Sequence, residues 1–159
     1  MRLTPSTVAD ERDWVRDRER IVPLINETRD RLGDRFGTDV GHVSLEQYHE
    51  EVDAVFADGD RAVNVAGLVG LLRGLDVEDD YPGFVVDEWL GRQLAATIAG
   101  GEPYTLLAQA TFHFADVTTH TEGPAGDDDL DAALAAGFQT RLPGWSWNAT
   151  ESPFSVPPK

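Results

Sequence analysis

The chain has 159 residues, of which 29 are Asp or Glu and 13 are Lys or Arg, so its formal net charge is −16. This length supports one ordinary hydrophobic core, and we expect a single domain. The acid excess argues against nucleic acid as a partner, the lack of an apolar run of about 20 residues argues against a membrane span, and the absence of cysteine excludes disulfides and thiolate chemistry.

The first predicted element is a long, mostly solvated helix from Thr7 to about Leu32. Its apolar residues recur every seven positions and its charged residues pair at spacings of three or four. Pro23 removes a backbone donor inside this stretch, so we expect a kink or break near Ile21. The heptad spacing also raises a coiled coil as an alternative, which charged residues at the remaining seam positions disfavour.

Two further helices are predicted before residue 76. Ser44 and Gln47 have the spacing of a capping box, which starts a helix that extends to about Ala57. Asp60 can cap the next helix, over 61–75, in which three glycines lie on one side and would let a neighbouring helix approach closely. A buried strand is the alternative for this apolar segment.

The second half of the chain predicts three more elements. A helix through Val86 and Ile98 ends at Gly100, and another begins near Pro103. Aromatic and β-branched residues make a strand over 111–119 the alternative to the end of that second helix. Acidic residues over 127–129 suit the start of a short last helix, which Gly137 is expected to end.

The expected fold class is therefore all-α, a single domain of five or six helices with a short strand near 111–119 as the alternative. The helical domain should cover residues 1–141. Residues 142–159 contain four prolines and no periodicity, which predicts an irregular tail. The tail either lies across the domain and buries its aromatic residues, Trp145 among them, or serves as a docking segment.

The four histidines provide the only constellation that suggests a metal site. Glu46 and His49 share one predicted helix face, and His113, Asp116 and His120 share another. If the two helices were neighbours, their imidazoles and carboxylates could bind zinc, manganese or iron. In so acidic a chain, however, a carboxylate close to a histidine is expected by chance, and these positions equally suit the boundary between core and solvent.

No recognised catalytic motif is present, so the primary hypothesis is a non-enzymatic protein-interaction or regulatory module that binds a protein partner or a second copy of itself, with no cofactor. The alternative is a divalent-metal-binding helical bundle that acts as a metal-dependent hydrolase. The excess of acids, with a single lysine against twelve arginines, resembles the composition of haloarchaeal cytosolic proteins. That resemblance implies a cytoplasmic, halophilic protein.

Overall fold

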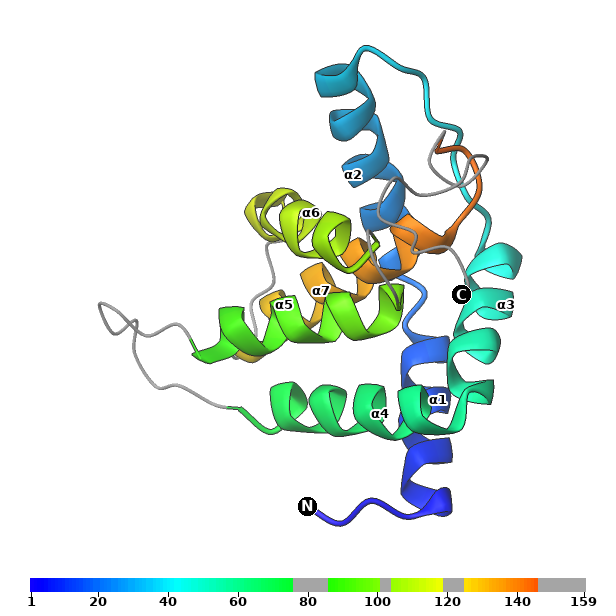
Figure 1. Ribbon diagram of the computed structural model, residues 1–159, viewed down its shortest axis with the longest axis vertical. Helices are drawn as coiled ribbons and strands as arrows, with labels where there is room; N and C mark the ends of the chain where they lie inside the picture. The colour runs from blue at the N-terminus through cyan, green and yellow to red at the C-terminus, as the bar shows by residue number, and fades with distance from the viewer. Residues whose placement is uncertain (76–85, 101–103, 119–124, 146–159) are drawn as a thin grey trace, which may run out of the picture.

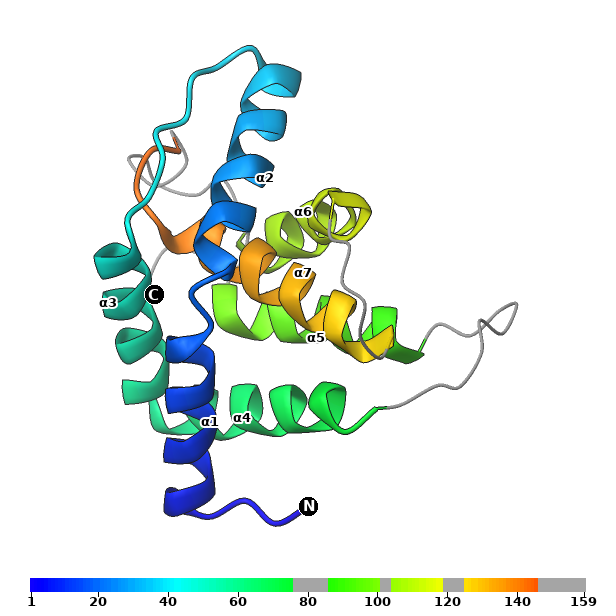
Figure 2. The same ribbon diagram turned by 180° about the vertical axis from the view of Figure 1, so that it is seen from behind.

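The computed structural model describes residues 1–75, 86–100, 104–118 and 125–145, and these ranges contain seven helices (Figures 1 and 2). The helices are α1 (Pro5–Asp17), α2 (Ile21–Phe36), α3 (Leu45–Ala57), α4 (Gly59–Arg73), α5 (Val86–Ala99), α6 (Tyr104–Thr118) and α7 (Ala125–Arg141). The all-α class is confirmed, but the expected count of five or six helices is too low. No helix in these ranges is long and apolar enough to cross a membrane.

The extra helix comes from the break at Pro23. Residues 18–20 form a turn between α1 and α2, so the single long helix expected from the sequence is two helices. Pro23 is the third residue of α2, where a backbone N–H has no partner inside the helix, and the missing donor therefore costs little. The expected break near Ile21 is confirmed.

Caps define the ends of α3 and α4. Ser44 and Gln47 form the expected capping box at the start of α3. The cap of α4 is Asp58, whose side chain accepts a hydrogen bond from the Arg61 N–H, so the expectation for Asp60 is wrong. Asp60 instead lies in the first turn, where its charge still favours the helix.

The segment for which a strand was the alternative is helical through Thr118. Thr111, Phe112 and Ala115 are buried together with Ala108, at the spacing of one helix face. Packing on α7 outweighs the β propensity of the aromatic and β-branched residues, because propensity is a weaker determinant than burial of a complete face.

Helix α7 lies at the centre of the fold and packs against α2, α3, α4, α5 and α6 (Figures 1 and 2). All of its residues from 129 to 140 are buried. Gly137 does not end this helix, contrary to expectation: a Cβ atom there would lie 2.8 Å from Cβ of Ile98, so the glycine permits close contact with α5. The glycine that suggested a helix end in the sequence is instead needed for the close packing of α7 on α5.

The carboxyl end of α7 is fixed by a buried arginine from α2. The guanidinium group of Arg29 donates hydrogen bonds to the carbonyl oxygens of Gly41, Leu142 and Pro143 at 2.6 to 2.9 Å. Burial lowers the pKa of Arg29 to about 10. Trp145, the last described residue, is buried beside it, and its indole N–H donates to the side chain of Gln139.

Candidate functional site

The densest group of ionisable side chains lies at the amino ends of α5 and α7. These two helices run in the same direction, so their first turns meet. Asp87 and Glu88 come from α5, and Asp128 and Asp129 from α7. Helix α6 runs antiparallel to α5 and brings its last turns to the same place, with Asp116 among the carboxylates. We call these five acids the carboxylate cluster.

Asp129 is the most perturbed member of the cluster. Only 7% of its surface is exposed, and its side chain is hydrogen-bonded to that of Asp87. A hydrogen bond between two carboxyl groups requires a proton on one of them. Burial, this hydrogen bond and the neighbouring charges raise the pKa of Asp129 to about 8. Asp129 is therefore protonated at neutral pH and can donate this hydrogen bond to Asp87.

Two basic side chains lie beside Glu88 of this cluster. Arg92 of α5 forms an ion pair with Glu88 one turn away, and Nδ1 of His113 lies 3.6 Å from the same carboxylate. Asp116 is half-buried, and its burial together with the charge of Glu88 raises its pKa. The arrangement can hold, share and release protons, and it attracts cations from solvent. No group of three or more side chains in the described ranges is arranged to hold a metal ion.

The structure brings together only part of the predicted metal-ligand set. His113 and Asp116 lie in the cluster region on α6, whereas Glu46 and His49 lie on α3, on another side of α7 (Figures 1 and 2). The Nε2–H of His49 donates to the carbonyl oxygen of Arg16 at 3.0 Å, which ties α3 to α1. Glu46 is exposed in the first turn of α3. His120 lies outside the described residues, and the metal site stays a prediction.

Sequence reasoning missed Asp87, Glu88 and Asp129 as partners of Asp116. Each was recognisable as an acid near the start of a helix, a common position because the helix dipole favours negative charge there. Nothing local to either segment indicates that α5 and α7 are parallel neighbours. Acidic residues at the start of each helix are visible in the sequence, but only the packing of α5 on α7 brings them together.

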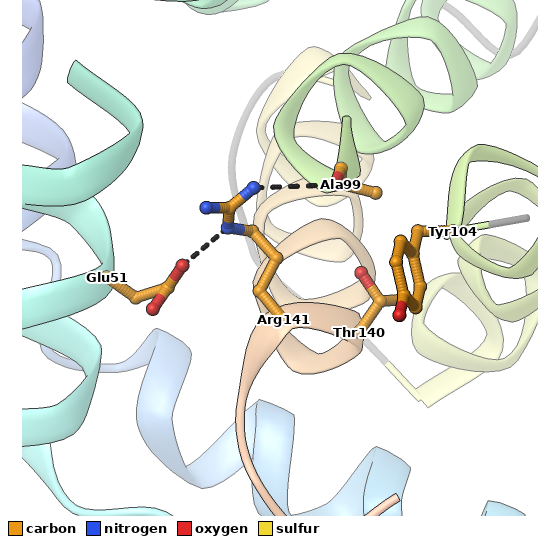
Figure 3. A pocket seen from close by; sticks show the side chains of 5 residues that line it. All are labelled: Glu51, Ala99, Tyr104, Thr140 and Arg141. Carbon is orange, nitrogen blue, oxygen red and sulfur yellow. Dashed lines mark hydrogen bonds and ion pairs between the residues drawn. The ribbon is translucent and has the colours of Figure 1, made fainter. Parts of the chain in front are cut away.

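A second candidate is a pocket of about 230 Å³ where α3, α5, α6 and α7 meet (Figure 3). Arg141 is ion-paired with Glu51 and donates to the carbonyl oxygens of Ile98 and Ala99 at the end of α5. The side chains of Tyr104 and Thr140 lie on the other side of the pocket. Because Glu51 already neutralises the guanidinium group, this pocket offers no free charge for a ligand, and its polar groups chiefly tie α3 and α5 to α7.

Comparison with known proteins places the chain in a family. The model of a domain of unknown function, DUF7984, matches residues 1–158, so the chain belongs to that family. Searches of curated proteins and of solved structures gave no match.

Proposed function

We propose that this member of the DUF7984 family is a non-enzymatic interaction module that self-associates through the outer face of α4. One observation carries the proposal: an apolar surface lies on the outside of this acidic chain. The surface consists of exposed apolar side chains and outward-facing glycines, which we call the α4 patch: Met1, Leu3, Val63, Gly67, Gly70 and Leu71.

The α4 patch arises because the glycines of α4 face away from the bundle. The other side of the helix, which includes Val65, Val69 and Leu72, is buried in the core. Of the neighbouring helices, α1 approaches Gly70 through the carboxylate of Glu11, which would lie 3.9 Å from a Cβ atom there. The residues that lie closest to these glycines are Leu3 and Met1 of the N-terminal segment, which runs along the outside of α4 (Figures 1 and 2).

These covering residues do not remove the apolar surface from solvent. Met1 is 74% exposed and Leu3 is 40% exposed, so their outer sides extend the patch. Val63 and Leu71 are also exposed, and each is four residues from Gly67 along the helix. The N-terminal segment and α4 thus present one apolar surface, the kind of feature that marks an interaction site.

Charge favours a second copy of the chain as the occupant. From Ala62 to Leu72 no residue is charged, although the whole chain carries −16. Two such chains repel each other wherever carboxylates face carboxylates, and contact through an uncharged helix face keeps that repulsion lowest. Molar salt shortens the Debye length to about 3 Å and screens the remaining repulsion, so the dimer should strengthen as salt rises.

The test is the molar mass in solution at several KCl concentrations. We expect a dimer in molar KCl, measured by sedimentation equilibrium or by light scattering after size-exclusion chromatography. Val63→Asp places a charge in an isologous interface twice, once from each copy, and should weaken dimerisation at least about tenfold. Val63 is exposed in the monomer, so the substitution leaves folding intact.

Val117→Asp is the matched control, because Val117 is also an exposed helical valine but lies on α6. This variant should dimerise as the unaltered chain does. A chain that stays monomeric in molar KCl at high micromolar concentration would overturn the proposal. Equal weakening by Val63→Asp and Val117→Asp would overturn the α4 patch as the interface.

A further inference from the structure

A groove of about 420 Å³ lies between α5 and α6, on helices that do not form the α4 patch. Such a volume is within the range of small-molecule sites. The groove has a neutral lining of two glutamines, two threonines and three small or apolar residues: Gln93, Ala96, Thr97, Gly100, Thr105, Leu106 and Gln109. In a chain with so many charged residues, a concave surface without one is distinctive.

The polar groups of this groove are available for a ligand. The hydroxyl of Thr105 is buried without a hydrogen-bond partner. In the ranges that the structure describes, the side-chain amides of Gln93 and Gln109 make no hydrogen bond. Thr97 donates its proton to the carbonyl oxygen of Gln93 at 2.6 Å, which leaves its hydroxyl oxygen free to accept. Both donors and acceptors thus line one groove.

The charge of the surroundings selects a neutral ligand. An anion would be repelled by the net charge of −16, and the guanidinium group of Arg61, which lies against Gly100, already faces the carboxylate of Asp58. A cation would be drawn instead to the carboxylate cluster at the other end of α5. A molecule with many hydroxyl groups suits the groove, because each hydroxyl both donates and accepts, as the glutamine amides and threonine hydroxyls require.

The surface of α5 also carries an exposed tryptophan, one helical turn before Gln93. Trp89 is 59% exposed and lies four residues before Gln93, on the same face of the helix. A large aromatic ring in solvent offers a flat apolar surface with a polar N–H at its edge. Sugar rings have one face of C–H groups and a rim of hydroxyls, which match the indole and the amides respectively.

We propose that the α5–α6 groove binds a neutral saccharide or polyol, with Gln93, Gln109 and Thr105 as hydrogen-bonding residues and Trp89 as the stacking surface. Binding in an open groove should be weak, with a Kd of about a millimolar. The site is independent of the α4 patch, so dimerisation and ligand binding succeed or fail separately.

The experiment is a titration of ¹⁵N-labelled protein with trehalose, maltose and sorbitol, each in turn, followed by NMR. We expect at least one of the three to shift the side-chain amide signals of Gln93 and Gln109 and the indole signal of Trp89, with saturation. The double variant Gln93→Ala and Gln109→Ala should raise the Kd about tenfold, since each amide loses its hydrogen bonds to the ligand. Trp89→Ala should raise it about fivefold.

Asn64→Ala removes an exposed amide on α4 and is the control, with an unchanged Kd expected. Thermal stabilisation alone does not count as support, because sugars stabilise folded proteins in general by exclusion from their surface. The proposal is overturned if none of the three probes gives saturable shifts at these signals. It is also overturned if the double glutamine variant binds as tightly as the unaltered chain.

Discussion

The two ends of the parallel helices α5 and α7 are surrounded by side chains of opposite charge. At their amino ends, the side chains of Asp87 and Asp129 are hydrogen-bonded to each other. At their carboxyl ends, Arg29 and Arg141 donate to carbonyl oxygens that the helices leave without partners. Negative charge at helix starts and positive charge at helix ends is favourable, and both ends follow this rule.

The two ends differ in how far the charges of their side chains are neutralised by neighbouring groups. Each arginine is surrounded by carbonyl oxygens or by one carboxylate, so the carboxyl ends carry no like-charge repulsion among the described residues. The amino ends gather five carboxyl groups from three helices, and burial together with neighbouring carboxylates raises the pKa of Asp129 and of Asp116. The carboxyl ends therefore stabilise the fold, whereas the amino ends make its stability depend on pH.

Removal of the arginine at the carboxyl end should have the largest effect. Arg29→Met keeps most of the side-chain volume but leaves the carbonyl oxygens of Gly41, Leu142 and Pro143 without their donors in a buried region. We expect a loss of about 3 kcal/mol in the free energy of unfolding, measured by urea denaturation in molar KCl. Arg31→Met, on the exposed side of α2, is the control and should cost less than about 0.5 kcal/mol. Equal losses would contradict this account of Arg29.

Helix α7 also contains a buried carboxylate that is fully paired with arginines, and its substitution can be compared with that of Arg29. Asp131 of α7 has a 2% exposed side chain and forms ion pairs with Arg18 and Arg20, in the turn between α1 and α2. Asp131→Asn should lower the free energy of unfolding by about 2 kcal/mol, less than the full loss of a buried pair because Arg20 is half exposed.

Asp53→Asn is the matched control, since Asp53 pairs with Arg16 at the surface. Its effect should be within about 0.5 kcal/mol in the same denaturation experiment. If Asp131→Asn proved as mild as this control, the contact between α7 and the turn would not be a stabilising one.

The smallest change in the free energy of unfolding at neutral pH should come from substitution of Asp129, and this change should grow as pH rises. The folded state holds a proton on Asp129 up to a pKa of about 8, whereas the unfolded chain releases it near its ordinary value of about 4. The folded state thus binds more protons across that window, so stability falls as pH rises from about 4 to 8 and this dependence ends above 8. The variant Asp129→Asn cannot ionise at this position, so it should lack this part of the dependence of stability on pH.

The measurement is the urea midpoint of both proteins at a series of pH values between 5 and 9. We expect Asp129→Asn to be near neutral at pH 5 and more stable than the unaltered chain at pH 9, by about 1 kcal/mol or more. Asp128→Asn alters the neighbouring residue, which is less buried, and should change the slope much less. Parallel pH curves for all three proteins would contradict a proton held by Asp129 in the folded state.

Elements with local signals were predictable from the sequence. The capping box at Ser44, the break near Pro23 and the all-α class all depend on residues within about one helical turn of each other. Burial of Trp145 against the domain was one of the two alternatives for the tail, and the structure shows Trp145 buried. The same local signals misled at Gly137, because a glycine that allows two helices to touch has the same sequence appearance as one that ends a helix.

What the sequence determined by itself, then, was the helical character of the chain, most of its helix boundaries and its acidic surface, since backbone hydrogen bonding and capping act over a few residues. Only the tertiary structure decided which helix is central, that α5 and α7 run parallel, and that Asp87 meets Asp129. It also placed His49 and His113 on separate helices around α7 and turned the glycines of α4 outward. These outcomes depend on how seven helices bury their apolar faces together, a choice that no single segment encodes.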